Sequence, residues 1–172
     1  MKDILLLIFI LLFFSCKREV KTENLAAKKI ANKKIDTISI SKTHKVNKII
    51  CDLDGDKKND IVEIVQSTRN KKSGLRIIFG NGKETKYFGM GNDILGQGFD
   101  ELDWVGIFEK APKGEVYANN VDENGDILAE DQIKEQDKIK LINDGIFIHA
   151  EESCGGGIIY MKNGEFEWIQ QE

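Results

Sequence analysis

The clearest fold signal lies near the C-terminus, where residues 157–169 have the sequence GIIYMKNGEFEWI. A run of apolar residues precedes Asn163-Gly164, a pair that tolerates the positive φ of a two-residue hairpin turn. After that pair, Phe166 and Trp168 alternate with glutamates, as expected for a strand with one buried face. This stretch therefore predicts two antiparallel strands joined by a tight turn.

The chain after residue 45 continues this pattern of short apolar segments and turns. Sixteen glycines against one proline suit a turn-rich sheet better than a helical bundle. With the two strands of the hairpin, ten segments have strand length and composition: 46–51, 61–66, 75–79, 85–88, 104–108, 115–120, 138–142, 145–150, 157–161 and 166–170. The sequence thus predicts a mainly β fold, an antiparallel meander of about eight to ten short strands with at most one short helix, over 128–136.

The N-terminus has the features of an export signal. Residues 4–14 form an unbroken run of eleven apolar residues after Lys2. A membrane-spanning helix needs about 20 such residues, whereas the core of a signal peptide needs about 7–15. A small residue, Ser15, stands directly before Cys16 at the end of the run. The run is therefore predicted to be a targeting segment.

This arrangement resembles the cleavage box of bacterial lipoproteins, although aromatic residues stand at 13 and 14 where the family more often has leucine and a small residue. The resemblance implies that residues 1–15 are a signal peptide and that Cys16 carries lipid, so that acyl chains hold the protein at a membrane of the bacterial cell envelope. Lys17 is similar to the residue that follows the cysteine in lipoproteins of the outer membrane. The alternative is an ordinary secretory peptide with an incidental cysteine.

Charge divides the chain into two regions. Residues 1–48 carry a formal charge of +7 and residues 49–172 one of −11, which together give the net charge of −4. We therefore expect a basic tether over 16–45, either a solvated spacer or a short basic helix, followed by an acidic β domain over 46–172. The acidic balance argues against nucleic acid as a partner.

The most specific chemical signal is the loop at residues 52–60, with the sequence DLDGDKKND. Carboxylates at alternate positions of a tight loop bring their oxygens toward one point, which suits Ca²⁺ with its about six to eight oxygen ligands. Without a cation these carboxylates repel one another. The predicted ligands are the side chains of Asp52, Asp54 and Asp56, the backbone carbonyl of Lys58, and Asp60 directly or through water. The alternative is a solvated acidic turn.

The setting of this loop differs from that of an EF-hand, because the flanking segments are predicted strands and Gly55 is the fourth residue rather than the sixth. The segment over 48–66 instead resembles the aspartate loop of FG-GAP and VCBS-type repeats. That resemblance implies calcium binding between two strands and no particular enzyme activity. Whether Glu63, at the twelfth position, is a further ligand is left open. The second acidic stretch, at 122–130, is interpreted as a hairpin.

Two cysteines remain besides Cys16. An even pair in an exported protein suggests a disulfide, here between Cys51 and Cys154. Because Cys51 directly precedes the aspartate loop, the bond would brace that loop against the glycines at 155–157. The alternative is two separate buried thiols.

The sequence offers few groups for nucleophilic catalysis. His44 falls in the expected tether and His149 in a predicted strand, and no nucleophile motif surrounds either residue. The acidic loop at 96–104 contains Asp100, Glu101 and Asp103, which in principle suit a glycosidase. Enzyme activity is thus left open, and a binding role is favoured.

The resulting hypothesis is a lipid-anchored envelope protein whose calcium-stabilised β domain binds a protein or a glycan. The alternatives are an envelope hydrolase that uses the loop at 96–104, and an inhibitor or immunity-type lipoprotein. The hydrolase would need a cleft around its carboxylates, whereas a binding module would expose aromatic side chains.

Overall fold

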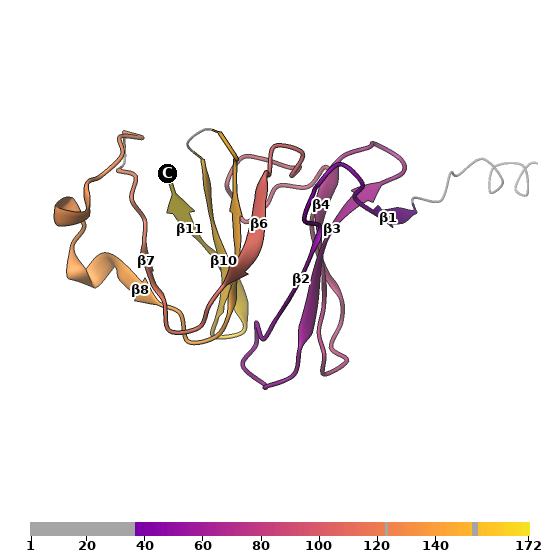
Figure 1. Cartoon of the computed structure of the whole chain (residues 1–172), viewed down its shortest axis with the longest axis horizontal. Coiled ribbons are helices and arrows are strands. Elements are labelled where there is room, and N and C mark those ends of the chain that lie inside the picture. Colours follow the sequence, from indigo (N-terminus) through magenta and orange to yellow (C-terminus); the bar gives the residue numbers. More distant parts are fainter. Residues whose placement is uncertain (1–36, 123, 153–154) are drawn as a thin grey trace, which may run out of the picture. The chain divides into compact units, whose positions relative to one another are not determined.

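The computed structural model of the chain describes residues 37–122, 124–152 and 155–172. The described residues belong to one compact unit, Asp36–Glu172. Among them, no helix has the length and apolar character needed to cross a membrane. The unit contains eleven strands and two single-turn 3₁₀ helices, so the predicted mainly β, antiparallel fold is confirmed (Figure 1).

The first sheet is built around one long strand. Its members are β1 (Ile38–Ile40), β2 (Lys48–Cys51), β3 (Asp60–Ser67), β4 (Ser73–Ile78) and β5 (Lys86–Gly89). β1 and β2 pair antiparallel with successive parts of β3, β4 pairs with β3 as well, and β5 pairs with β4. The β2–β3 connection is the aspartate-rich loop, so the predicted arrangement of strand, aspartate loop and strand is present.

The second sheet has the order β11-β10-β9-β6. Its strands are β6 (Ile107–Ala111), β9 (Gly145–His149), β10 (Gly156–Lys162) and β11 (Glu165–Gln171). β10 and β11 pair over seven residues, from Gly156↔Gln171 to Lys162↔Glu165. Asn163 and Gly164 join them with φ of 53° and 87°, which is the two-residue turn that the sequence predicts.

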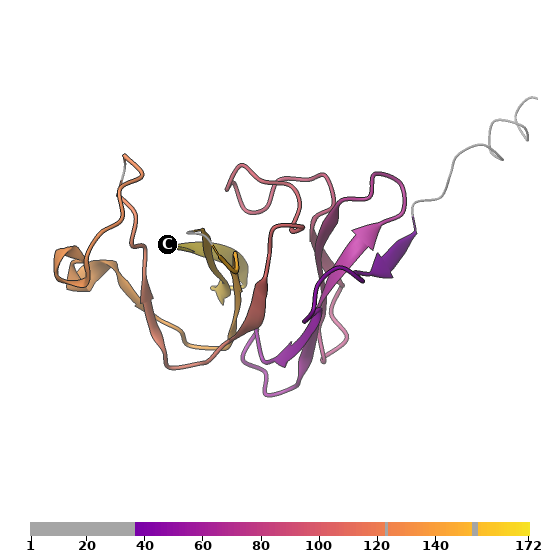
Figure 2. The ribbon, with the colours of Figure 1, turned by 45° about the horizontal axis from the view of Figure 1, so that its top comes forward.

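A separate two-stranded pair, β7 (Val116–Ala118) with β8 (Lys138–Lys140), continues the chain beyond β6. Between these two strands lie the 3₁₀ helices η1 (Glu130–Gln132) and η2 (Glu135–Asp137). The predicted single short helix over 128–136 is thus replaced by two 3₁₀ turns, the second of which ends one residue beyond that segment. Figure 2 shows this segment at the end of the β7–β8 pair. The hairpin interpretation of 122–130 holds, because an isolated bridge joins Val121 and Ile127 around Asn124-Gly125.

The second sheet is buried on both faces. Ile146 and Ile148 of β9 and Ile159 of β10 join the main core, against Val62, Ile64, Leu75 and Ile77 of the first sheet. Their neighbours Phe147, Ile158 and Tyr160 face the other way, into a second cluster with residues of β7, β8 and β11. Because adjacent strand residues point to opposite faces, the unbroken apolar run of β10 serves two cores at once.

The compact unit begins earlier than the predicted boundary at residue 46. Each of the ten predicted segments overlaps a strand, although β6 lies three residues later than predicted, and β1 lies in the segment expected to be tether. Ser41 and His44, from the same segment, are 3% and 8% exposed. The boundary therefore needs correction to about residue 36. The net basic charge of the segment hid three strand residues, Ile38–Ile40, whose pairing partner Val65–Ser67 lies far along the chain.

Candidate metal centre

The aspartate-rich loop leaves β2 after Cys51 and enters β3 at Asp60, and these two residues face each other in the β2–β3 ladder. Two residues at the tip have positive φ, Gly55 at 75° and Lys57 at 67°. Such backbone folds the loop tightly enough for side chains from its two ends to meet. Backbone N–H groups of Asp56 and Lys58 donate to the carboxylates of Asp54 and Asp56, at 3.3 and 2.8 Å.

Three of the predicted ligand side chains converge. One carboxylate oxygen from each of Asp52, Asp54 and Asp60 lies within 4.8 Å of the other two. Oxygens that share one Ca²⁺ at about 2.3–2.6 Å are at most about 5 Å apart, so this spacing fits a common ion. Asp56 is exposed and lies outside the group of three, while Lys58 brings its N–H group to Asp56.

Asp60 is the buried member of the group, with 0% exposure. Its Oδ2 accepts a hydrogen bond from Leu53 N at 2.9 Å, and its Oδ1 accepts one from Gly80 N at 2.9 Å. Burial raises the pKa of Asp60, the two hydrogen bonds oppose that rise, and the charges of Asp54 and Asp52 add to it. A cation in this place would therefore relieve an electrostatic cost.

Asp52 carries an unsatisfied oxygen. Its Oδ2 accepts from Lys57 N at 3.0 Å, whereas its Oδ1 is buried with no hydrogen-bond partner among the described residues. Buried carboxylate oxygens are normally paired with a donor or a metal. Among the described side chains, this oxygen is the strongest indication that the loop has room for a cation as a further partner.

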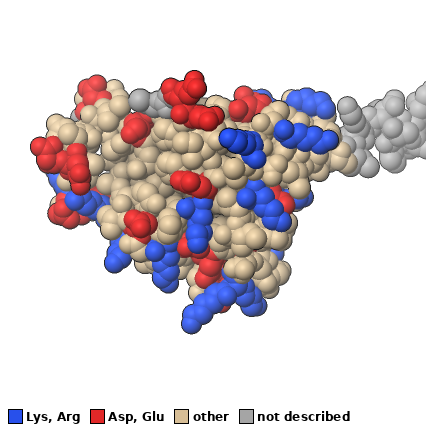
Figure 3. Space-filling model, in the orientation of Figure 1, with Lys and Arg blue, Asp and Glu red and all other residues tan. Residues whose placement is uncertain are grey.

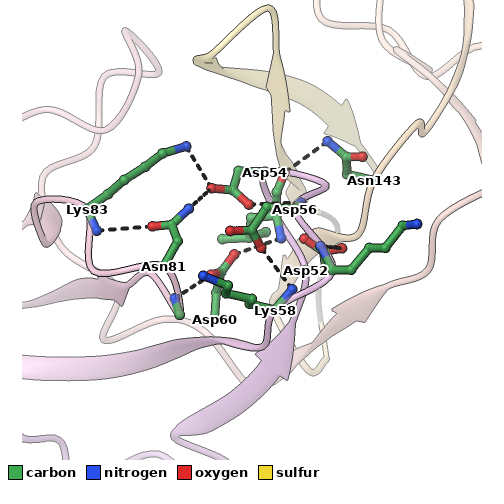
Figure 4. Close-up of polar contacts among 11 residues, drawn as sticks. Asp52, Asp54, Asp56, Lys58, Asp60, Asn81, Lys83 and Asn143 are labelled. Atoms are coloured by element: carbon green, nitrogen blue, oxygen red, sulfur yellow. Dashed lines mark hydrogen bonds and ion pairs between the residues drawn. The ribbon is translucent and has the colours of Figure 1, made fainter.

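Asp54 is held by the β4–β5 loop. Its Oδ2 accepts from Asn81 Nδ2 at 2.7 Å and from Lys83 Nζ at 2.8 Å, and Figure 4 shows both side chains reaching toward it from the same side. The side chain of Asp54 is 4% exposed. Burial alone would raise its pKa, but the hydrogen bonds from Lys83 and Asn81 outweigh burial and lower it. Lys83 is thus a built-in positive charge beside the acidic group.

The opposite side of the loop is braced by the turn before β9. Asp144 N donates to Asp52 O at 3.1 Å, and Asp144 Oδ2 accepts from Asp52 N at 3.1 Å. Asn143 Nδ2 also donates to Leu53 O at 3.3 Å. The loop is therefore tied to both sheets, and these partners, like Lys83, were missed because no local pattern links them to residues 52–60.

Two acidic residues considered from the sequence are used elsewhere. Glu63 pairs with Arg76 across the β3–β4 ladder, with Nε to Oε2 at 3.0 Å, and it lies outside the group of three aspartates. Asp122 Oδ1 accepts from the N–H groups of Asn124 and Asp126, which shapes the hairpin there. On the face drawn in Figure 3, acidic and basic side chains are interspersed.

Of the three cysteines, Cys51 is the one that lies among the described residues. Cys16 and Cys154 lie outside the described residues, so the lipid site and the disulfide stay predictions. Cys51 is 2% exposed, and burial, followed by the charges of Asp144 and Asp60, raises its pKa to about 12.

The carboxylates of the loop at 96–104 are not part of the lining of the cavity beside this loop. Asp100 pairs with Lys72. The cavity beside this loop, of about 230 Å³, has an uncharged lining among the described residues. A larger cavity, of about 640 Å³, is lined by residues of β7, β8, β11 and the η1–η2 segment. No described contact therefore favours the hydrolase alternative.

No protein-family model, curated protein or solved structure matches the chain.

Proposed function

We propose that the β2–β3 loop binds Ca²⁺ through Asp52, Asp54 and Asp60, with Asp56 and the carbonyl of Lys58 as further oxygen donors. The observation that carries this proposal is the buried, unpartnered Oδ1 of Asp52 beside two other converging carboxylates. Oxygen donors without thiol or imidazole favour a hard cation, and Ca²⁺ tolerates the irregular geometry of such a loop better than Mg²⁺ does.

The role of the ion is structural. The loop contacts the β4–β5 loop through Asn81 and Lys83, and the turn before β9 through Asn143 and Asp144. An ion held by this loop would stabilise the end at which the two sheets meet. Only the folded chain gathers these carboxylates, so calcium binding would add to the free energy of unfolding.

The calcium-stabilised domain is proposed to act as a binding module at the bacterial cell envelope. Its proposed ligand is a protein or a glycan. Support for the location comes from the lipobox-like residues Ser15-Cys16 after an apolar run of signal-peptide length. Lipid on Cys16 would anchor the chain to a membrane, with the outer membrane as the proposed address. The mainly β fold with exposed aromatic side chains is compatible with a binding role.

Thermal unfolding of the protein in chelator and then in millimolar calcium tests the metal site. At a calcium concentration about one hundred times Kd, the linkage adds about 2.7 kcal/mol, which raises Tm by several degrees. Asp54→Ala should abolish the rise, while the control Asp126→Ala, in the 122–130 hairpin, should keep it. Identical curves with and without calcium would refute the metal site.

Acyl labelling of the expressed chain tests the anchor. Wild type should take up labelled fatty acid and be processed, whereas Cys16→Ser should remain an unlabelled precursor. Equal labelling of both chains would remove the lipid anchor from the proposal and leave the metal site untouched.

A further inference from the structure

The cavity of about 230 Å³ lies between the loop at 96–104 and the β10–β11 hairpin. Three aromatic side chains line it, Phe99, Trp104 and Trp168, together with two amides, Gln97 and Gln170, and glycine backbone at the start of β10. Its volume is below the about 300–1,000 Å³ of pockets for drug-sized ligands. It therefore suits a single ring or the end of a chain.

The three aromatic rings hold one another in place. Phe99 meets Trp104 edge to face at 5.4 Å and 90°, and it meets Trp168 at 5.7 Å and 66°. Both indole N–H groups already have acceptors, Glu101 O at 3.1 Å and Gln170 Oε1 at 2.9 Å. The rings thus contribute their carbon surfaces to the cavity, and Trp104 remains 36% exposed.

The loop that carries Phe99 and Trp104 is fixed from the first sheet. Leu102 belongs to this loop, and its N–H group donates to Ser73 Oγ at 3.0 Å. His44 Nε2 donates to Leu102 O at 2.8 Å, and His44 Nδ1 is hydrogen-bonded to Ser41 Oγ at 2.7 Å. Lys72 holds Asp100 in the same loop. The cavity is therefore formed before any ligand arrives, which limits the entropy lost on binding.

The chemistry of the lining selects among ligands. Aromatic faces are electron-rich and attract the weakly positive C–H groups on one face of a saturated sugar ring. Each amide offers both donors and acceptors, as hydroxyl groups require. Gln97 uses only its Nε2, on Leu95 O, whereas Gln170 already bonds Trp168 through Oε1 and Glu172 through Nε2, which leaves one lone pair and one N–H of Gln170 for a ligand. No residue of the described lining carries a charge. The Glu172 carboxylate lies next to Gly155 and Gln170, and it accepts a hydrogen bond from Gln170 Nε2 at 2.6 Å.

We propose that this aromatic cavity binds a neutral pyranose sugar, as the end or one unit of a glycan. The proposal rests on the binding-module function above, and it commits that module to a glycan and to a site. A quaternary ammonium group is the competing occupant, because aromatic rings also attract cations. The uncharged lining favours the sugar.

The chain contains only two tryptophans, and both line this cavity, so its intrinsic fluorescence reports on the site. The full chain, in a detergent without sugar headgroups, is titrated with the β-1,4-linked trimers of glucose and of N-acetylglucosamine, with a mannose trimer, and with tetramethylammonium. We expect a saturable fluorescence change with at least one trisaccharide and none with tetramethylammonium.

Two variants then place the binding. Trp104→Ala, with Trp168 still reporting, should weaken the responding trisaccharide by about fivefold or more. Gln97→Ala, on the exposed loop, should weaken it as well and covers the case in which the tryptophan variant fails to fold. Tyr87→Ala is the matched control, because Tyr87 is an exposed aromatic on β5, 48% exposed and outside the cavity.

A response to tetramethylammonium alone, no response to any trisaccharide, or binding unaffected by both cavity variants would overturn the proposal. The calcium-dependent rise in Tm is measured on the same samples. If that rise persists without a saccharide response, the sugar site is refuted and the metal site stands. A saccharide response without the rise in Tm would support the sugar site and refute the metal site.

Discussion

At the scale of single residues, the acidic loop is balanced by one lysine from another loop. Lys83 Nζ lies 2.8 Å from Asp54 Oδ2, and the pKa of Lys83 is raised by that hydrogen bond. The ammonium group of Lys83 therefore pairs with the carboxylate that Ca²⁺ would bind, and the two cations compete for Asp54. The affinity of the site is then set by residue 83 as well as by the aspartates.

Removing this competitor should strengthen calcium binding. We expect Lys83→Met to lower the calcium Kd by about three- to tenfold, because a charged hydrogen bond to Asp54 no longer has to break. Calcium titration by calorimetry measures the Kd of wild type and of each variant. Lys86→Met is the control, because Lys86 pairs with the exposed Glu84 and not with an aspartate of the described loop. An unchanged or higher Kd in Lys83→Met would show that Lys83 does not compete.

A second residue-scale prediction concerns pH. Tyr160 Oη donates to Glu167 Oε2 at 2.6 Å, and this bond, opposed by some burial, lowers the pKa of Glu167. A carboxyl whose folded pKa is depressed stabilises the protein above its unfolded pKa of about 4.3, and that contribution is lost as pH falls through the folded pKa.

Tyr160→Phe should therefore lower Tm by a constant amount between about pH 5 and 8, and the gap from wild type should shrink below about pH 4. Thermal scans across this range measure the gap. Tyr87→Phe, at an exposed position on β5, should show no such pH-dependent gap. A Tyr160→Phe gap that stays constant to pH 3 would mean that Glu167 is not the partner that matters.

At the scale of secondary-structure elements, β3 organises the first sheet, because β1, β2 and β4 all pair with it. Its alternate residues Val62 and Ile64 are fully buried in the main core. On the opposite face, Glu63 pairs with Arg76 of β4 and Lys48 of β2. The first residue of the same strand is Asp60, so the packing of β3 also positions the buried carboxylate of the metal centre.

Ile64→Ala should lower the free energy of unfolding by about 2–5 kcal/mol, since it leaves a cavity between the sheets. Ile50→Ala, on the neighbouring β2 but 53% exposed, should cost less than about 1 kcal/mol. Urea denaturation of both variants checks the pair. Similar losses would show that the inter-sheet core does not depend on β3.

At the scale of the whole molecule, the compact unit encloses a cysteine that the sequence pairs with another. Cys51 is part of the main core, and its pKa of about 12 leaves almost no thiolate at neutral pH. A buried thiol of this kind acts as a small apolar side chain.

We expect Cys51 to resist iodoacetamide in the native protein and to react after unfolding without reductant, as peptide mass analysis will show. A cysteine with an accessible free thiol reacts with iodoacetamide in both the native and the unfolded protein, and it serves as the internal control. If Cys51 stays unreactive toward iodoacetamide in denaturant and reacts only after reductant is added, the disulfide with Cys154 would be supported instead.

The local sequence determined much of this protein. Strand alternation and Asn-Gly turns located ten strands, because the period of two and the positive-φ turn are properties of neighbouring residues. The spacing of Asp52, Asp54 and Asp60 likewise predicted a convergent acidic group, since a tight loop brings alternate side chains together. Asp56 falls outside that group, because loop curvature, rather than spacing, decides which carboxylates meet.

Only the tertiary structure decided the rest. β1 is too short and too exposed to be recognised without its partner on β3, and His44 acquired its role only when it met Leu102 of a distant loop. Lys83 and Asp144 reach the metal centre from two other loops, and Trp104 and Trp168 share one cavity although they lie on separate elements. The physical reason is the same in each case: these contacts form between segments that are remote in sequence, and their energy appears only when the chain folds and brings those segments together.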